Sequence, residues 1–341
     1  MKAMILAGGM STRLYPLTKQ VPKPIVPVAG EPISAHVMRW LSGFGYDEVA
    51  INVFYLAEFV ERTFGDGSPF GVKLRYLRER ELTGSAGALK QMEGWFDETF
   101  VVVGCDDLTD ADLGALVRFH KARGALATIG LVEAEEVEQY GVVILDADGR
   151  ITGFQEKPAK GTEKSKLANT GIYVFEPAIF ERIPAGTFYD FGKQVFPELL
   201  RDGLPFYAMQ LEGAYWRDIG TLDEYRRATD DVLCGRVAIR GARATGIPAS
   251  AMVASDARIE GPVRVGEGAQ IASGSHIVGP SVIGDGVQIG EGATLERTIV
   301  WNGSMIGPHA TLRDAIVGER YIVGEGAVLE GAIVANEPAE S

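Results

Sequence analysis

The chain has 341 residues, 46% of them apolar, and its 33 Lys and Arg against 46 Asp and Glu give a net charge of −13. This acidic balance argues against nonspecific binding to nucleic acid or to an anionic membrane, because both need clustered positive charge. The apolar runs are too short for a signal peptide or a membrane span, and two cysteines make neither a disulfide framework nor a zinc site. We expect a cytoplasmic protein of about two domains.

Strand-like and helix-like patterns alternate through the first 235 residues. Short buried strands are predicted at 2–7, 49–53, 72–77, 100–104 and 127–131. Apolar residues at helical spacing predict helices between them, at 33–44, 56–64, 86–95 and 112–123. The alternation predicts an α/β catalytic domain, 1–235, with a Rossmann-like, doubly wound, mostly parallel sheet. Ligands of such a sheet bind at the carboxyl ends of its strands.

The first predicted strand leads into a glycine-containing loop with two basic residues. The loop reads Gly8-Gly9-Met10-Ser11-Thr12-Arg13-Leu14, followed by Pro16-Leu17-Thr18 and Pro22-Lys23-Pro24. Two glycines let backbone N–H groups approach an anion, and Arg13 offers a fork of donors suited to phosphate. Flanking prolines stiffen the backbone around Lys23, which then serves as a point charge. The loop predicts phosphate binding, although it is neither a Walker loop nor a Gly-x-Gly-x-x-Gly motif.

The composition changes near residue 240. All 11 lysines lie at or before Lys193, and only two aromatic residues, Trp301 and Tyr321, follow residue 246. Aliphatic residues recur at every sixth position, and the period slips by one residue three times: Ile247, Val253, Ile259, Val265, Ile271, Ile277, Ile283, Ile289, Leu295; Val300, Ile306, Leu312; Val317, Val323, Leu329; Val334. Period six is typical of a hexapeptide β-helix, in which one inward aliphatic residue per strand stacks on the next coil. We therefore predict a linker at 236–246 and a parallel β-helix of about five coils at 247–341.

Residues 8–24 resemble the signature of the sugar-1-phosphate nucleotidyltransferases, also called nucleotide-sugar pyrophosphorylases. That signature is Gly-Gly-x-x-Thr-Arg-Leu-x-Pro-Leu-Thr followed by Pro-Lys-Pro. The resemblance continues through Thr83-Gly84-Ser85-Ala86-Gly87, Val102-Val103-Gly104-Cys105-Asp106, Tyr140-Gly141-Val142-Val143, Glu156-Lys157-Pro158, Asn169-Thr170-Gly171 and Trp216-Arg217-Asp218-Ile219-Gly220. The hexapeptide tail also occurs in this family, where the β-helix is left-handed. Within the family, the chain is most similar to the mannose-1-phosphate guanylyltransferases.

The resemblance implies a role for each matching residue. It implies nucleotide binding by Leu6, Ala7, Gly8, Gly9, Thr12, Arg13, Lys23, Glu79, Gly84 and Asp106, and sugar-phosphate binding by Gly141, Glu156, Lys157, Asn169 and Thr170. It also implies that Asp106 and Asp218 bind Mg²⁺. The chain departs from the family pattern at Ser11, where many members have glycine, and at Asp107, which is an alternative metal ligand. Strand alternation predicts that Asp106 and Asp107 point to opposite faces.

The implied reaction joins two polyanions. An oxygen of the sugar-1-phosphate attacks the α-phosphorus of a nucleoside triphosphate and expels pyrophosphate. Arg13 and Lys23 offset the charge of the triphosphate, Lys157 that of the sugar phosphate, and Mg²⁺ on Asp106 and Asp218 stabilises charge in the in-line transition state. No protein nucleophile or general base is required, because the attacking oxygen is already ionised.

Glu79 bears on the choice of nucleobase. Uridylyl- and thymidylyltransferases of the resembling family have a Gln a few residues before the second glycine loop, and counting back from Gly84 places Glu79 there, with Glu81 as an alternative. A Gln donates and accepts, which suits uracil or thymine, whereas a carboxylate only accepts, which suits the N1–H and amino group of guanine. We therefore expect GTP and mannose-1-phosphate as substrates. Alternatively, Glu79 is a solvated charge within residues 78–81, and the enzyme is a glucose-1-phosphate uridylyl-, thymidylyl- or adenylyltransferase.

Two other function classes fit the sequence less well. A hexapeptide acyltransferase would need a catalytic histidine, but His276 and His309 both lie within regular hexads, and no insertion shapes an acyl-donor pocket among the first nine repeats. A non-catalytic regulatory homologue should have lost a phosphate-binding base or a metal carboxylate, and this chain keeps them all. We expect the β-helix to serve assembly or regulation, and the protein to form a homo-oligomer.

Overall fold

The computed structural model describes residues 1–134, 136–241 and 243–337. These residues form two compact units. The first contains Met1–Gly9 and Val37–Asp218, and the second contains Met10–His36 and the chain from Ile219 onward. Met10–His36, which follows the first two glycines and falls within the predicted catalytic domain, 1–235, thus belongs to the same compact unit as the C-terminal part of the chain. None of the helices in the described part of the chain is long and apolar enough to cross a membrane.

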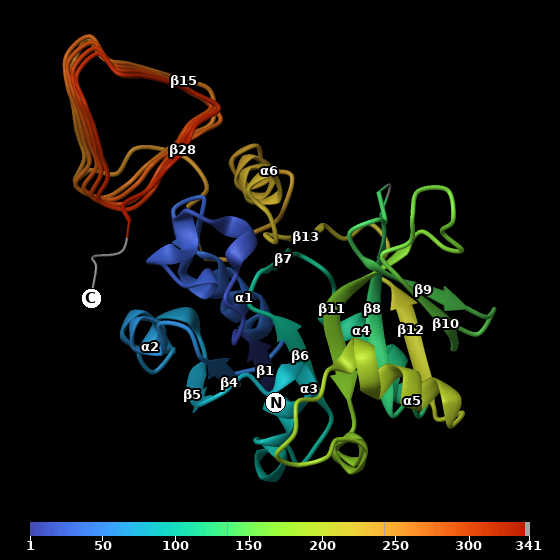
Figure 1. Cartoon of the computed structure of the whole chain (residues 1–341). Helices are drawn as coiled ribbons and strands as arrows, with labels where there is room; N and C mark the ends of the chain where they lie inside the picture. The colour runs from blue at the N-terminus through green and yellow to red at the C-terminus, as the bar shows by residue number, and fades with distance from the viewer. Residues whose placement is uncertain (135, 242, 338–341) are drawn as a thin grey trace. The chain divides into compact units, whose positions relative to one another are not determined.

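A nine-stranded sheet organises the first unit (Figure 1). Its main order is β10-β9-β11-β6-β1-β4-β5, and β8 joins β11 to β12. The strands are β1 (Lys2–Leu6), β4 (Glu48–Val53), β5 (Lys73–Arg78), β6 (Phe100–Gly104), β8 (Ala127–Glu133), β9 (Gly141–Leu145), β10 (Ile151–Glu156), β11 (Leu167–Phe175) and β12 (Phe206–Gln210). β1, β4, β5 and β6 run parallel, which confirms the Rossmann-like prediction. β11 runs antiparallel to β6, and β9 and β10 form a hairpin, so the other half of the sheet is mixed.

Helices connect the parallel strands and carry much of the core. They are α1 (Ile33–Ser42), α2 (Ala57–Phe64), α3 (Gly84–Lys90), α4 (Leu113–Ala122) and α5 (Phe196–Arg201). The predicted helix 86–95 is shorter than expected, because α3 ends at Lys90 and a separate 3₁₀ turn covers Glu93–Trp95. The core that α3 and α5 share with the sheet is rich in stacked aromatic rings, such as Phe175 on Phe191 at 5.1 Å.

The C-terminal part of the second unit is the predicted parallel β-helix, whose coils stack as triangles (Figure 1). Its three five-stranded sheets are β14-β17-β20-β23-β26, β15-β18-β21-β24-β27 and β16-β19-β22-β25-β28. The strands are β14 (Met252–Val253), β15 (Arg258–Glu260), β16 (Val263–Val265), β17 (Gln270–Ile271), β18 (His276–Val278), β19 (Ser281–Ile283), β20 (Gln288–Ile289), β21 (Thr294–Glu296), β22 (Ile299–Val300), β23 (Met305–Ile306), β24 (Thr311–Arg313), β25 (Ile316–Val317), β26 (Ile322–Val323), β27 (Val328–Glu330) and β28 (Ile333–Val334). The five coils match the predicted number.

The hexad positions form the core of the β-helix, with one exception. Residues from Val265 to Val323 at these positions are buried, and those nearer the two ends of the β-helix, Val253, Ile259, Leu329 and Val334, are partly buried against them. Ile247 does not follow the prediction, because its side chain is 49% exposed. It precedes Met252, where the first strand of the β-helix begins, and therefore has no coil beneath it.

The slip in the hexad period shortens one corner of the triangle by a single residue. Ile277 pairs with Leu295, and Leu295 pairs with Leu312. The second of these separations along the chain is one residue shorter than the first. Two of the three shortened corners contain Arg297 and Asp314, and both residues adopt a left-handed backbone with φ 48°. This conformation turns the chain between β21 and β22, and again between β24 and β25, with one residue fewer.

Three further elements complete the second unit: α6 (Leu222–Leu233) and the short strands β2 (Pro27–Val28) and β3 (Glu31–Pro32). A two-stranded ladder of β7 (Asp107–Thr109) and β13 (Trp216–Asp218) belongs to the first unit.

Candidate active site

The carboxyl ends of β1, β4, β5 and β6 meet at one edge of the sheet, because these four strands are parallel neighbours. Immediately after β1, the backbone N–H of Ala7 donates to Oδ1 of Asn52 at 2.9 Å. Asn52 lies near the end of β4, and its side chain is buried. Sequence reasoning missed Asn52, although a polar residue within a buried apolar strand was a usable signal.

Glu79 follows β5 and connects the two glycine loops. Its side chain is only 9% exposed. One carboxylate oxygen, Oε2, accepts a hydrogen bond from Nδ2 of Asn52 at 2.6 Å. The other, Oε1, accepts from the hydroxyl of Thr83 at 2.6 Å and from its N–H at 3.2 Å. The alternative interpretation of Glu79 as a solvated charge is therefore wrong, and the neighbouring Arg78 pairs with Glu61 instead.

The second glycine loop packs tightly against residues 187–190. Gly84 has φ 78°, and a Cβ there would lie 2.4 Å from the carbonyl oxygen of Tyr189. The same oxygen accepts hydrogen bonds from the N–H groups of Ala86 and Gly87, both at 3.0 Å. Only glycine combines this backbone conformation with so close an approach, which explains its presence at position 84.

A turn places two carboxylates at the end of β6. Strand alternation does not apply there, because Cys105 and Asp106 form the turn between β6 and β7. Oδ1 of Asp106 and Oδ2 of Asp107 both approach Gly104, lying 2.9 Å and 2.7 Å from the position that a Cβ would occupy. The prediction that Asp106 and Asp107 point to opposite faces is therefore wrong.

The two neighbouring carboxylates differ in their surroundings. Asp107 is 4% exposed and accepts hydrogen bonds from the N–H of Gly104 at 3.0 Å and from Nε1 of Trp216 at 3.1 Å. Asp106 is only partly buried. Asp218, also partly buried, lies directly opposite Asp107 in the ladder of β7 and β13. The hydrogen bonds of Asp107 thus stabilise the turn. Asp106 and Asp218 are more exposed to solvent than Asp107, as residues that bind a ligand must be.

These carboxylates fit Mg²⁺ by their chemistry. Among the described residues, no group of three or more His, Cys, Asp or Glu side chains is arranged to hold a metal ion. Mg²⁺ is usually bound through one or two carboxylates and completes its octahedron with water and substrate phosphates. A pair of partly exposed carboxylates is therefore a suitable donor set.

The residues predicted to bind sugar phosphate lie on β9, β10 and β11, except Lys157, which directly follows β10. Gly141 and Glu156 pair across the β9–β10 hairpin, and the side chain of Glu156 lies outside the described residues. The N–H of Lys157 donates to the carbonyl oxygen of Tyr140 at 3.1 Å. Thr170 is buried, and its hydroxyl donates to the carbonyl oxygen of Gly130 at 2.7 Å. The hydroxyl of Thr170 is therefore used within the sheet.

A bulge in β11 brings this segment close to the acidic turn. The register of β11 shifts between Asn169 and Tyr173, and Oδ1 of Asn169 accepts from the N–H of Gly171 at 2.9 Å. A Cβ on Gly171 would lie 3.2 Å from Oδ2 of Asp107. Residues 169–171, which are predicted to bind sugar phosphate, therefore lie next to the acidic turn within the first unit.

The basic residues of the first loop belong to the second unit. Thr12 and Arg13 lie exposed in a 3₁₀ turn, Thr12–Leu14, and Lys23 begins another, Lys23–Ile25. Ser11 has φ 53°, a left-handed conformation that glycine adopts more readily than other residues do. The roles of Thr12, Arg13 and Lys23 beside the sheet residues stay predictions.

Two family models match the chain. The nucleotidyl transferase model matches residues 2–234, and the model of the GMPPB C-terminal domain matches residues 259–340. The chain belongs to the sugar-1-phosphate nucleotidyltransferase family. The match to the nucleotidyl transferase model includes both glycine loops, the turn at residues 105–106 and the segments predicted to bind sugar phosphate.

Relatives in this family differ in the substrates that their names state. A UTP–glucose-1-phosphate uridylyltransferase of Synechocystis is 41% identical over 288 residues, which cover 78% of this chain and 74% of the relative. A mannose-1-phosphate guanylyltransferase of Mycobacterium tuberculosis is 35% identical over 272 residues, covering 78% and 75%. A solved structure of a glucose-1-phosphate thymidylyltransferase of Bacillus anthracis, in complex with a sucrose, aligns with a TM-score of 0.61 and 25% identity, covering 72% of this chain and 98% of that one.

Proposed function

We propose that this sugar-1-phosphate nucleotidyltransferase uses GTP and mannose-1-phosphate and releases GDP-mannose and pyrophosphate. The observation that carries the proposal is Glu79, a buried carboxylate between the two glycine loops at the carboxyl edge of the sheet. The match of the C-terminal residues to the GMPPB domain and the guanylyltransferase relatives support the same choice.

The chemistry rests mainly on charge and position. Arg13 and Lys23 bind the triphosphate and offset its charge, and Lys157 does the same for the sugar phosphate. Asp106 and Asp218 would hold Mg²⁺, which when bound neutralises phosphate charge in the transition state. The phosphate oxygen of the sugar is ionised at neutral pH and attacks without a protein base. Alignment of the two substrates therefore supplies much of the rate enhancement.

Recognition of guanine would use the remaining capacity of Glu79. A carboxylate has about four acceptor positions, and Asn52 and Thr83 occupy three of them. One position on Oε2 is left for the N1–H or the amino group of guanine. Two donors of guanine can both be bound in one of two ways. Thr83 gives up its hydrogen bonds to Oε1 of Glu79, or a backbone carbonyl oxygen accepts the second hydrogen bond from guanine.

A second candidate pair is UTP and glucose-1-phosphate. The 41% identical uridylyltransferase favours it, as does the extent to which protein groups already use the Glu79 carboxylate. In that case Glu79 orders the two glycine loops and does not discriminate among bases.

The deciding experiment combines four triphosphates with mannose- and glucose-1-phosphate and measures pyrophosphate release. We expect the highest kcat/KM for GTP with mannose-1-phosphate. Glu79→Gln should lower the preference for GTP over UTP by about tenfold or more, because one charge-assisted hydrogen bond to guanine is worth roughly 1.5–3 kcal/mol. Glu81→Gln is the matched control, since Glu81 is exposed and carries the same change. A wild-type preference for UTP, or an unchanged preference in both variants, would contradict the assignment of guanine.

A further inference from the structure

The segment Met10–His36, which carries Arg13 and Lys23, is held by a buried hydrogen-bonded relay within the second unit. The hydroxyl of Tyr225 on α6 donates to the carbonyl oxygen of Pro27 at 2.8 Å. Nε1 of Trp301, which follows β22 of the β-helix, donates to the same hydroxyl at 2.8 Å. Tyr225 and Trp301 are both buried, and their rings meet edge to face. A β-helix residue is thereby connected to the backbone four residues after Lys23.

Two more parts of the C-terminal region contact the same segment. Nζ of Lys19 forms an ion pair with Glu337 at 2.7 Å, and Nε2 of Gln20 donates to the carbonyl oxygen of Glu337 at 2.6 Å. In the first coil, Arg264 is 8% exposed and its guanidinium lies against Gly30, where a Cβ would be 2.0 Å from Nη1. The first coil, the third coil and the end of the described chain all hold this segment.

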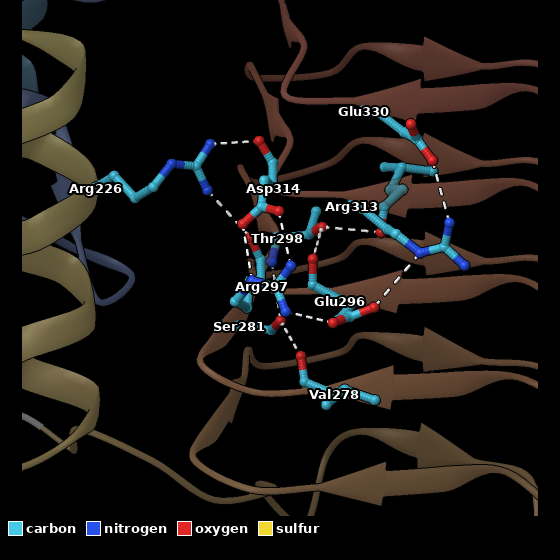
Figure 2. Close-up of polar contacts among 10 residues, drawn as sticks. Arg226, Val278, Ser281, Glu296, Arg297, Thr298, Arg313, Asp314 and Glu330 are labelled. Carbon is cyan, nitrogen blue, oxygen red and sulfur yellow. Dashed lines mark hydrogen bonds and ion pairs between the residues drawn. The ribbon is translucent and has the colours of Figure 1, made fainter.

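Helix α6, the middle of the relay, is itself fixed to the β-helix at the shortened corners (Figure 2). Arg226, the residue after Tyr225, donates to the carbonyl oxygens of Arg297 at 3.1 Å and Asp314 at 2.6 Å. The side chains of Arg297 and Asp314 join the two corners through hydrogen bonds of 2.8 Å to each carboxylate oxygen. The slip in the hexad period thus creates the corners whose carbonyl oxygens accept hydrogen bonds from Arg226 of α6.

The segment has little regular structure of its own. Between residues 10 and 26 it contains only short 3₁₀ turns, and 3₁₀ turns have poor hydrogen-bond geometry. Its conformation therefore depends on packing against other elements. A loop that is ordered before its ligand arrives binds more tightly, because less conformational entropy is lost on binding.

We propose that the β-helix positions the phosphate-binding segment, and that Trp301, acting through Tyr225, is a positioning residue for triphosphate binding. This inference rests on the proposed function, in which Arg13 and Lys23 bind the triphosphate. It assigns the tail a role in substrate binding in addition to any role in assembly.

The test compares Trp301→Phe with the wild type in the full-length enzyme. The variant keeps an aromatic ring in the coil and removes the indole donor. Hydrogen exchange should become faster in residues 10–30 and stay unchanged in β1 and β4. The KM for the triphosphate should rise by roughly fivefold, as expected for one lost buried hydrogen bond, and the KM for the sugar phosphate should change by less than about twofold.

Trp40→Phe is the matched control. Trp40 is equally buried, and its Nε1 donates to the carbonyl oxygen of Ala111 at 2.9 Å, within the first unit. This control should lower stability by a similar amount and leave the KM for the triphosphate unchanged. If Trp301→Phe does not fold, Glu337→Gln offers an exposed change at a separate contact to the same segment, the ion pair with Lys19. Its effect should be smaller, and high salt should remove the difference between this variant and the wild type, because salt screens an exposed ion pair.

The outcomes separate this inference from the proposed function. Faster exchange in residues 10–30 together with a raised triphosphate KM supports the positioning role. Unchanged exchange in Trp301→Phe and in Glu337→Gln overturns it. Faster exchange with an unchanged triphosphate KM also overturns the positioning role, and it places the error in the assignment of Arg13 and Lys23, because the segment is then anchored but does not bind the nucleotide.

Discussion

The sheet of the first unit and the β-helix of the second bury their apolar residues in different ways. The β-helix stacks Ile, Val, Leu and Ala from successive coils, so each core residue meets its counterparts from the coils above and below. The sheet core interlocks aromatic rings from distant parts of the chain, such as Phe96 with Phe180 and Phe100 with Phe175. Regular spacing specifies the first kind of core, and only the assembled fold specifies the second.

Polar contacts differ in the same way. In the β-helix they connect residues one coil apart, as in Arg297 with Asp314 and Arg313 with Glu330. At the candidate active site, Glu79 meets Asn52 and Asp107 meets Trp216, which are 27 and 109 residues apart. Contacts between neighbouring coils therefore stabilise the repeat locally, whereas the candidate site depends on elements that are far apart in the sequence.

The largest loss of stability is expected from a charge placed in the core of the β-helix, where each residue packs against residues of the neighbouring coils. Ile283→Asp would bury an unpaired charge among aliphatic residues, so the tail should unfold or aggregate, at a cost of several kcal/mol. Thermal melting and light scattering check this result. Ile322→Asp is the control, because Ile322 lies in a strand of the same β-helix and is 69% exposed. Equal melting temperatures for Ile283→Asp and the wild type would contradict the coil model.

The next prediction separates the three carboxylates of the acidic turn and β13. Asp106→Asn and Asp218→Asn should each lower kcat by at least about a thousandfold with little loss of stability, because Mg²⁺ prefers charged oxygens. Steady-state kinetics over a range of Mg²⁺ concentrations, with melting curves, measure both effects.

Asp107→Asn should behave differently. The amide has only one oxygen, so it cannot accept hydrogen bonds from both Gly104 and Trp216 as the carboxylate does. The substitution should lower the free energy of unfolding by about 1–3 kcal/mol. If Asp107→Asn is inactive but stable and Asp106→Asn is nearly as active as the wild type, then Asp107 is the metal ligand and the role assigned to Asp106 is wrong.

The smallest expected effect is a pH dependence at the joint between α6 and the β-helix. Burial raises the pKa of Asp230 from 3.8 to about 6, with Asp231 and Asp314 adding to the rise and Arg226 and Arg236 opposing it. The folded state therefore binds a proton more tightly than the unfolded state does, and Asp230 contributes a loss of stability as the pH rises from about 4 to 6. Asp230→Asn removes this loss.

We expect Asp230→Asn to be more stable than the wild type by about 1 kcal/mol at pH 7, after allowance for solvent screening of a half-buried group. Near pH 4 the two proteins should differ little. Urea unfolding at both pH values measures the difference, and a constant gap between them would show that Asp230 is not the titrating group.

The amino-acid sequence by itself determined the features that depend on neighbours in the chain. The hexad spacing specified the coils from Val253 to Val334, because in a β-helix each residue packs against the residue one coil later. The alternating patterns specified the parallel strands β1, β4, β5 and β6, and the glycine loops and acidic motif specified the family.

Only the tertiary structure decided which groups meet. Strand alternation failed for Asp106 and Asp107, because the chain turns at residues 105–106 and both carboxylates reach Gly104. The sequence likewise did not predict the hydrogen-bond partners of Glu79 or the hydrogen bonds from Arg226 to the shortened corners. A hydrogen bond between residues far apart in the sequence requires its donor and acceptor atoms to lie about 3 Å apart, and the folding of the whole intervening chain sets that distance, so no local pattern carries that information.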